Sequence, residues 1–189
     1  MNFNENNFQI IRNFIEPDFV EFIQDYFSMK INAGDVSFEN QQVVGSYEWY
    51  GDTLTETILQ NSCEAISKKI GMSIVPSYSF TRLYMKGDEL TKHIDRASCE
   101  ISATLSLGYS QDNYINPIYF SKYFDERNAE EVILYPGDLC VYKGCSLYHW
   151  RPPIQNKWLL QTFLHFVNAE GEYKHKIYDE RPYLGFPKN

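Results

Sequence analysis

The sequence predicts a mainly β fold with N-terminal helices, an α+β chain in which the helices cover one sheet of a double-sheet jelly roll. Apolar residues recur at helical spacing in the first third of the chain, whereas after Pro76 apolar and polar residues alternate with period two. Aromatic residues make up 16% of the chain, which suits strands. With 189 residues and no repeat, the chain is expected to form a single domain, residues 1–189.

Two helices are expected before most of the strands. A short strand over residues 8–14 leads to Pro17, which suits a first helical turn, and the apolar residues that follow repeat at helical spacing. A second helix is expected over residues 53–69. Its first residue and Glu56 have capping-box spacing, and Gly71 is placed to end it.

The strands of the jelly roll come next, separated by turn residues such as Pro136-Gly137-Asp138. Short β-branched and aromatic runs with regular turns indicate such a double-sheet arrangement. These runs cover residues 78–84, 100–107, 117–120, 132–134, 139–142, 146–149 and 158–167. The expected organisation is therefore a helical support over residues 1–75, a catalytic jelly-roll core over 76–168 and a C-terminal arm over 169–189.

Charge and composition exclude several classes of partner. The net charge is −8 and no basic cluster is present, which argues against a nucleic-acid partner, because that affinity is carried by Lys and Arg. Hydrophobic residues make up 43% of the chain, and the composition does not predict a membrane-spanning segment. The four cysteines form no Cys-x-x-Cys pair and the N-terminus lacks a basic, then apolar, signal segment, so a cytoplasmic location is expected.

Three residues predict a metal centre. His93 and Asp95 lie two positions apart in a β-favouring stretch, so their side chains are expected on one face of a strand. His149 follows a strand that Pro136-Gly137-Asp138 opens, and it can approach the same ion from a neighbouring strand. Two imidazoles and one carboxylate on one face of an ion leave other positions open, as in non-haem Fe(II) oxygenases. The pattern therefore predicts a metal-dependent oxidation enzyme.

The surroundings of these residues carry a resemblance to a known family. The segment from Tyr84 through Gly87 and Leu90 to His93 and Asp95 has the spacing Tyr-x-x-Gly-x-x-(aromatic)-x-x-His-x-Asp. It resembles the prolyl 4-hydroxylase-like members of the Fe(II)/2-oxoglutarate dioxygenase superfamily, and the resemblance covers about residues 78–167. Leu90 departs from the pattern by standing where an aromatic is usual, so the pocket wall differs and substrate identity does not carry over.

The resemblance implies a double-stranded β-helix, the cupin-like form of the jelly roll, with Fe(II) held by His93, Asp95 and His149. It further implies 2-oxoglutarate as co-substrate, O2 as oxidant and ascorbate as a supporting reductant. The implied reaction hydroxylates an unactivated C–H bond and releases succinate and CO2. The implied substrate is a prolyl residue in a peptide or protein, or a small molecule of similar shape.

The expected charges of the metal and the co-substrate predict a cation in the pocket. Fe(II) with one carboxylate carries about +1 and 2-oxoglutarate about −2, so the remote carboxylate requires a cation in a partly dry pocket. Lys157 stands near the start of the last strand, where the resemblance places such a cation, and Arg151 lies two residues past His149 on the metal-facing side. Both stay candidates, with Tyr84 as a phenol partner. Gln161 is the alternative with Tyr84 if neither cation anchors the carboxylate.

Substrate contacts are predicted around the mouth of the pocket. Arg96 follows the Asp ligand and offers either a cation to the substrate or an ion pair to a carboxylate. Trp49 and Tyr50 lie in a segment before the second helix that is rich in aromatic residues, which grip peptides or proline rings. The alternative is that these aromatic side chains simply cover the barrel.

Three other classes of function remain open. A non-enzymatic cupin-like module could bind metal as a sensor, although such a module does not need open metal positions. A nucleic-acid demethylase of the same superfamily would require a basic groove, which the charge disfavours. A zinc hydrolase could use the same ligands, but no Glu general base stands beside them.

Overall fold

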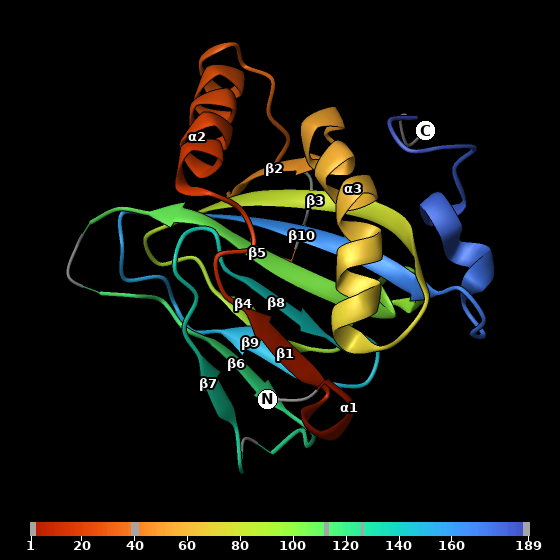
Figure 1. Ribbon diagram of the computed structural model, residues 1–189. Helices are drawn as coiled ribbons and strands as arrows, with labels where there is room; N and C mark the ends of the chain where they lie inside the picture. Colours follow the sequence, from red (N-terminus) through yellow and green to blue (C-terminus); the bar gives the residue numbers. More distant parts are fainter. Residues whose placement is uncertain (1–2, 39–41, 112–113, 126, 187–189) are drawn as a thin grey trace.

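The computed structural model describes residues 3–38, 42–111, 114–125 and 127–186, and within them two antiparallel sheets face each other (Figure 1). The larger sheet has the order β1-β8-β5-β10-β3-β2 and the smaller one the order β4-β9-β6-β7. The strands are β1 (Phe8–Ile11), β2 (Tyr47–Tyr50), β3 (Ile74–Met85), β4 (Leu90–His93), β5 (Ile101–Tyr109), β6 (Ile118–Ser121), β7 (Glu130–Val132), β8 (Leu139–Tyr142), β9 (Tyr148–Arg151) and β10 (Trp158–Asn168). This arrangement is the predicted jelly roll.

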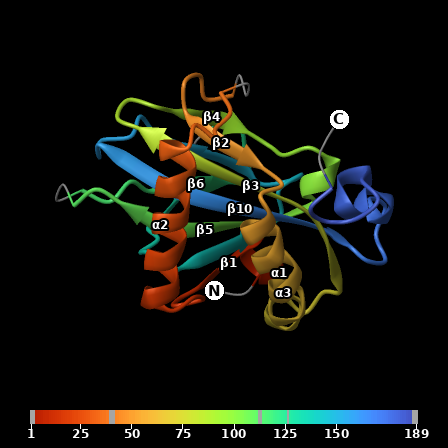
Figure 2. The ribbon, with the colours of Figure 1, turned by 90° about the horizontal axis from the view of Figure 1, so that it is seen from above.

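The helices cover the outer face of the larger sheet. After the short α1 (Phe3–Asn6), the helices α2 (Pro17–Asn32) and α3 (Thr53–Ile70) lie over β3, β5 and β10 (Figures 1 and 2). Side chains of β10 alternate as expected, because Leu160, Leu164 and Phe166 join the core beneath the helices. Leu159 and Phe163 belong instead to a second cluster between the sheets. The alternation therefore separates the helix-packing face from the face that lines the interior.

Helix α3 begins with a different cap from the one expected. The side chain of Asp52 accepts a hydrogen bond from the backbone N–H of Leu54, so Asp52 is the N-cap and the Thr53–Glu56 capping box is wrong by one residue. At the other end Gly71 adopts the left-handed conformation and closes the helix, as expected. Glu56 is thereby available for a buried contact further along the chain.

Two strands were not expected as such, and both border the interior. Strand β2 adds to the edge of the larger sheet through pairing with β3, and β4 pairs with β9 in the smaller sheet. Strand β4 ends at His93, so Asp95 lies just beyond the strand rather than on it. The expectation that one strand carries both ligands is therefore wrong. Tertiary contacts, described below, hold the carboxylate in place.

The C-terminal arm packs against α3 and the larger sheet. It contains the short helix η2 (Lys174–Glu180), and a buried ion pair joins Arg181 to Glu56 at 2.5 Å. Tyr178, Asp179 and Glu180 all have positive φ angles, a conformation that costs energy in residues other than glycine.

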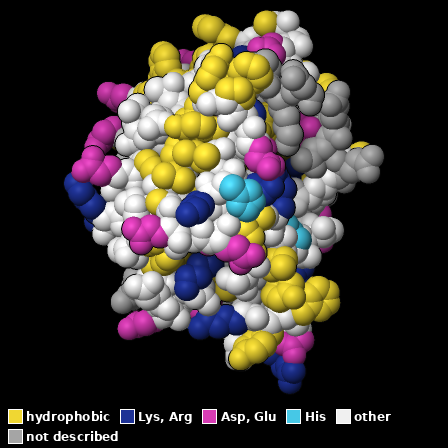
Figure 3. Space-filling view, turned by 90° about the vertical axis from the view of Figure 1, so that its right-hand side faces the viewer, with side chains coloured by type: hydrophobic (Ala, Val, Ile, Leu, Met, Phe, Trp, Pro, Cys, Tyr) yellow, Lys and Arg dark blue, Asp and Glu magenta, His cyan; other side chains and the backbone are white. Residues whose placement is uncertain are grey.

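The surface of the described part of the chain shows no large segregation of charge on the face in Figure 3. Lys and Arg side chains lie interspersed with Asp and Glu side chains there. No helix among the described residues combines the length and the apolarity needed to cross a bilayer.

Candidate active site

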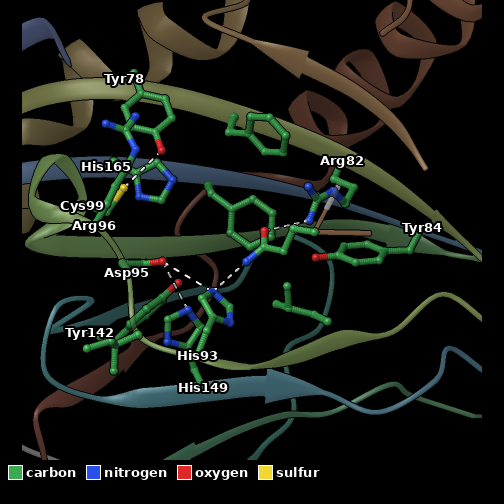
Figure 4. Close-up of a pocket in the computed structure, with 15 residues that line it drawn as sticks. Tyr78, Arg82, Tyr84, His93, Asp95, Arg96, Cys99, Tyr142, His149 and His165 are labelled. Carbon is green, nitrogen blue, oxygen red and sulfur yellow. Dashed lines mark hydrogen bonds and ion pairs between the residues drawn. The ribbon is translucent and has the colours of Figure 1, made fainter. Parts of the chain in front are cut away.

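The two histidines and the aspartate meet between the sheets (Figure 4). Nε2 of His93 lies 3.6 Å and Nε2 of His149 lies 3.5 Å from Oδ1 of Asp95. Residues His93 and His149 are direct cross-strand neighbours in β4 and β9, which brings their rings within 4.2 Å of each other, centroid to centroid. One ligand atom from each of the three residues lies within 4.8 Å of the others, a group that could hold a metal ion.

Backbone carbonyls fix the protonation of both imidazoles. Nδ1 of His93 lies 2.8 Å from the carbonyl oxygen of Thr91, and Nδ1 of His149 lies 3.0 Å from that of Leu147. A carbonyl oxygen only accepts hydrogen bonds, so in each ring Nδ1 carries the proton and donates. When such a ring is neutral, its lone pair is on Nε2, which faces Asp95. This is the arrangement in which histidine binds a metal.

Two hydrogen bonds hold Asp95 although it lies outside a strand. Its backbone N–H donates to the carbonyl of Gly144 at 2.9 Å, and the hydroxyl of Ser102 donates to its Oδ2 at 2.7 Å. Burial alone would raise the pKa of Asp95, but when His149 and His93 are protonated, their charge and their hydrogen bonds outweigh burial and hold the pKa well below its usual range. The carboxylate is therefore ionised, with Oδ1 directed toward the imidazoles and Oδ2 used by Ser102.

Only glycine fits at position 144. A Cβ atom there would lie 2.5 Å from Oδ2 of Asp95 and 2.8 Å from Oγ of Ser102, and it would collide with the backbone carbonyl of Cys99. The missing side chain thus allows the connection between β8 and β9 to pass directly behind the metal-facing carboxylate.

The triad opens onto a cavity of about 260 Å³ between the two sheets. Four inward side chains of β3 line its roof, Tyr78, Phe80, Arg82 and Tyr84, and these alternate with residues that face the helices. His93, Asp95 and His149 form part of the floor (Figure 4). The cavity therefore has two ends, one at Tyr78 and one at Tyr84, with the triad between them.

Arg151 lies beyond the Tyr84 end. It follows His149 by two residues on β9, its side chain points into the interior, and it is only 2% exposed. Nη1 donates to the carbonyls of Asn116 and Pro117, whereas Nε has no hydrogen-bond partner among the described residues. Burial lowers the pKa of Arg151, and nearby Tyr84 and Tyr142 partly oppose that effect. No carboxylate of the described residues forms an ion pair with this buried cation.

The other polar groups at this end are only partly satisfied. The hydroxyls of Tyr84 and Ser106 are buried without a hydrogen-bond partner in the described structure. Gln161 faces the interior as expected, next to Ser106 across the strands, and its Oε1 accepts from Thr104 at 2.8 Å. Unsatisfied buried donors are rare in folded proteins, which makes this end a candidate ligand site.

Lys157 does not reach this region. It lies in the turn before β10 and its side chain is exposed. Of the two candidates for the anchor of 2-oxoglutarate, Arg151 is buried and Lys157 is exposed, and the binding role of either residue stays a prediction. The turn between β9 and β10 ends before the inward-facing run, which begins at Leu159.

The opposite end of the cavity contains a neutral hydrogen-bonded group. His165 lines the cavity, and its Nδ1 lies 2.9 Å from Oγ of Ser102. Burial lowers the pKa of His165 to about 4, so this ring is neutral at neutral pH. Cys99 lies close by and its Sγ is 3.1 Å from the hydroxyl of Tyr78. Burial raises the pKa of the Cys99 thiol well above its usual value.

Asp95, Cys99 and His165 are a second group close enough to hold a metal, and it shares Asp95 with the first. The raised pKa of Cys99 disfavours the thiolate that binds metals. The triad with two oriented imidazoles is the stronger candidate.

The three residues expected at the mouth have different positions. Arg96 lines the cavity, but it is engaged in a bidentate ion pair with Asp179 at 2.7 and 2.9 Å. Tyr50 donates its hydroxyl to the same carboxylate at 2.7 Å. Trp49 points the other way, because successive residues of β2 face opposite sides. Its ring packs on Phe27 of α2 at 4.7 Å, so the expectation of a substrate contact from Trp49 is wrong.

Sequence reasoning missed Arg82. It is 1% exposed and lines the cavity roof, with Nη2 at 3.6 Å from Glu48 and Nη1 at 3.4 Å from Oε1 of Gln42. Arg82 lies two residues before Tyr84 on β3, so period-two alternation places both side chains on the same face. That alternation was the signal by which Arg82 could have been found.

Comparison with known proteins gives structural relatives only. No family model matches the sequence, and no curated protein matches it. A prolyl-4-hydroxylase from Pseudomonas putida superposes with a TM-score of 0.65 at 15% identity, covering 86% of this chain and 94% of that one. A prolyl hydroxylase from Trichoplax adhaerens, solved with a hypoxia inducible factor peptide, gives 0.70 at 13% identity, with 89% and 86% covered.

A third relative is HygX from Streptomyces hygroscopicus, solved with nickel, 2-oxoglutarate and hygromycin B bound. It superposes with a TM-score of 0.69 at 10% identity, covering 89% of this chain and 85% of that one. At these identities the comparisons establish the fold. The chain has the jelly-roll fold of the 2-oxoglutarate- and Fe(II)-dependent oxygenases, as the resemblance in the sequence predicted.

Proposed function

We propose that the protein is an Fe(II)- and 2-oxoglutarate-dependent dioxygenase whose metal ligands are His93, Asp95 and His149. The observation that carries the proposal is the convergence of two Nε2 atoms on Oδ1 of Asp95, with both Nδ1 protons already committed to backbone carbonyls. Such a set of ligands occupies one face of an octahedral ion and leaves the other positions for ligands that react. The fold of the relatives supports the same reading.

Hydroxylation of an unactivated C–H bond is the chemistry that bound Fe(II), 2-oxoglutarate and O2 supply together, with succinate and CO2 as further products. Within the protein, Thr91 and Leu147 orient the two imidazoles, and Ser102 holds the carboxylate of Asp95 in place. The neutral His165 and the protonated Cys99 keep additional charge away from the metal-facing oxygen.

Arg151 and Tyr84 are proposed to bind the remote carboxylate of 2-oxoglutarate. A buried guanidinium without an anionic partner is costly, and a carboxylate would neutralise it and accept from its Nε. The hydroxyls of Tyr84 and Ser106 offer further donors at the same end of the interior. The protein thus supplies one cation and two unsatisfied hydroxyls where a dianionic co-substrate would place its second charge.

The substrate is proposed to be a prolyl residue of a peptide or protein, or a small molecule of similar shape. Relatives of the same fold were solved with a peptide fragment and with hygromycin B, so the fold accepts both kinds of ligand. The cavity of about 260 Å³ lies below the range of roughly 300–1,000 Å³ of drug-sized ligand pockets, which favours a small group at the metal. We also propose one catalytic domain, residues 1–189, with its jelly-roll core over residues 76–168.

The experiment that tests the function is release of succinate from 2-oxoglutarate by the purified protein with Fe(II) and ascorbate. Turnover of 2-oxoglutarate that depends on Fe(II) and O2 is expected even without substrate, at a low uncoupled rate. Proline-containing peptides and free amino acids are then added one at a time, and a substrate is expected to increase the rate of succinate release. Tight metal binding with no succinate under any condition would contradict the dioxygenase and favour the cupin-like binding module.

A further inference from the structure

The roof of the cavity holds a second buried cation that the co-substrate does not require. Arg82 lies on β3 between the inward-facing Phe80 and Tyr84, is 1% exposed, and lines the cavity above the triad (Figure 4). Its counterpart Arg151 lies on β9 in the opposite sheet. The described interior therefore offers guanidinium groups from both sheets.

One edge of the Arg82 guanidinium has no hydrogen-bond acceptor in the part of the chain that the structure describes. Neither Nε nor Nη2 has a hydrogen-bond partner among the described residues, although Glu48 lies 3.6 Å from Nη2 as an ion-pair partner. That separation is too long for a hydrogen bond. Nε and Nη2 form the edge of the fork that a carboxylate occupies with two parallel hydrogen bonds. Arg82 thus has its charge balanced by Glu48 while its best hydrogen-bonding edge stays unused.

The distance from Arg82 to the metal-facing atoms suits a small ligand. The side-chain amide of Gln42 spans the gap, with its nitrogen 3.0 Å from Nε2 of His93 and its oxygen 3.4 Å from Nη1 of Arg82. One amide group therefore bridges the guanidinium and the triad. A ligand that places a carboxylate on Arg82 would hold its next few carbon atoms beside the metal site.

The two arginines differ in whether a carboxylate already lies beside them, and this difference suggests different roles. Arg151 has no carboxylate among its described neighbours, so it suits the dianionic co-substrate, which brings excess negative charge. Arg82 already has Glu48, so an anion bound there gains mainly directional hydrogen bonds. Such a site selects a ligand by the shape of its carboxylate.

We propose that Arg82 binds a carboxylate of the substrate, so that the substrate is a small carboxylic acid such as a free amino acid. This inference rests on the proposed dioxygenase function and narrows its substrate class. The volume of the cavity, about 260 Å³, agrees with a small substrate. A prolyl residue inside a polypeptide has its α-carboxyl group in a peptide bond, so it would lack the carboxylate that this proposal places on Arg82.

The test measures binding without turnover. The protein is loaded with Fe(II) and 2-oxoglutarate in the absence of O2, and the charge-transfer absorption of that complex is titrated with free L-amino acids. Each amino acid is paired with its carboxamide, which has the same shape and no negative charge. At least one amino acid is expected to perturb the absorption, and its carboxamide is expected to bind roughly thirtyfold more weakly or worse, about 2 kcal/mol.

Two variants separate recognition from scaffolding. Arg82→Gln is expected to lose the preference for the carboxylate while the affinity for 2-oxoglutarate stays unchanged. Glu48→Gln removes the ion-pair partner but keeps the guanidinium, so it is expected to retain or strengthen amino-acid binding. A purely structural role of the Arg82–Glu48 pair predicts equal losses in both variants.

Several outcomes overturn the inference. They are binding of no carboxylate by the wild type, equal binding of acid and carboxamide, equal losses in Arg82→Gln and Glu48→Gln, or an unchanged preference in Arg82→Gln. Weakened 2-oxoglutarate binding in Arg82→Gln would assign Arg82 to the co-substrate instead. Failure of the wild type to bind 2-oxoglutarate at all would count against the proposed function itself, and the inference would fall with it.

Discussion

The backbone carbonyls of Thr91 and Leu147 decide the chemistry of the two histidines. Each carbonyl belongs to the residue two positions before its histidine, and each accepts from Nδ1. The same local arrangement therefore occurs twice, on β4 and on the approach to β9. It directs both Nε2 lone pairs toward Asp95 before any metal binds, which lowers the cost of assembling the site.

Removal of any ligand of the proposed centre is expected to abolish function. His93→Ala, Asp95→Ala and His149→Ala should each lower metal affinity and succinate release by at least about a hundredfold, since even outer partners of metal ligands contribute 10–100-fold. The fold should persist because the three side chains border a cavity. Equilibrium dialysis with Fe(II) and circular dichroism measure the two quantities.

His175→Ala is the matched control, because His175 is exposed in the C-terminal arm. It should bind metal and release succinate like the wild type. Normal metal affinity in any of the three ligand variants would remove that residue from the centre.

The two cations named from the sequence should behave differently. Arg151→Gln is expected to raise the concentration of 2-oxoglutarate needed for half-maximal turnover by about a hundredfold or more, because a buried charge partner is worth roughly 3–5 kcal/mol. Lys157→Gln is the control, since that side chain is exposed, and it should leave the requirement unchanged. The rate of succinate release at a series of 2-oxoglutarate concentrations measures this requirement in each variant.

The opposite pattern, with Lys157→Gln impaired and Arg151→Gln normal, would mean that the turn before β10 rearranges when the co-substrate binds. No effect in either variant would leave Tyr84 with Gln161, the alternative raised from the sequence, as the anchor.

At the scale of elements, the connection from β8 to β9 is as important as the strands. Strand β4 stops at His93, so Asp95 depends on the carbonyl of Gly144 for its backbone position and on Ser102 of β5 for its carboxylate. The proposed metal site is therefore assembled from both sheets and from the β8–β9 connection. Such a site is sensitive to the backbone of a loop that contributes no ligand.

Gly144→Ala tests that dependence. The added methyl group would contact Asp95 and Ser102, so metal affinity is expected to fall by about tenfold or more while most of the fold survives. Ser146→Ala lies in the same connection, where its side chain is exposed, and it should have no such effect. Metal titration of both variants measures the difference in affinity. Equal metal affinities of the two variants would show that the loop can accommodate the methyl group without displacing Asp95.

At the scale of the whole molecule, the C-terminal arm contacts Arg96, a residue that lines the cavity. Asp179 comes from the arm, and it accepts hydrogen bonds from Arg96 next to the metal ligand and from Tyr50 of β2. Its own backbone has a positive φ angle of 54°, which costs energy in an aspartate. The ion pair with Arg96 offsets that strain, so the arm and the mouth of the cavity stabilise each other.

This contact predicts an acid-dependent loss of stability. Burial would raise the pKa of Asp179, but hydrogen bonds from Arg96 and Tyr50 outweigh it, so the folded pKa lies below the ordinary value. A carboxyl group with a lowered pKa stabilises the fold fully above its unfolded pKa of about 4, and that stabilisation is lost as the pH falls further.

Asp179→Asn should therefore be less stable than the wild type at neutral pH, with a difference that shrinks below about pH 4. Chemical denaturation at a series of pH values measures the difference. Glu172→Gln, an exposed carboxylate of the same arm, is the control. A difference in stability that stays constant down to the lowest pH would contradict the role of the ionised carboxylate.

The overall charge predicts no affinity for nucleic acids. The net charge is −8, and on the face shown in Figure 3 the cations lie among carboxylates rather than in a basic patch. Titration of the protein into labelled DNA and RNA at physiological salt should give no binding. Saturable binding of DNA or RNA under these conditions would instead support the nucleic-acid demethylase alternative.

The sequence by itself determined the fold class and the candidate metal ligands. Period-two alternation identified β10 and its inward face, and the spacing from Tyr84 to Asp95 identified the resemblance, because both signals lie within a few neighbouring residues. Helix α3 was predicted for the same reason, although Asp52 rather than Thr53 caps it.

Only the tertiary structure decided which charges face the site. The sequence left both Arg151 and Lys157 as candidates, because their positions depend on where the turn before β10 places each backbone. The partner of Arg96 lies 83 residues away in the arm, and Trp49 packs on a helix that precedes it in the chain. The role proposed for Arg82 depends on its contacts with Glu48 and Gln42, which belong to other segments of the chain. Such contacts are set by the pairing of distant strands and by loop geometry, for which local periodicity carries no signal.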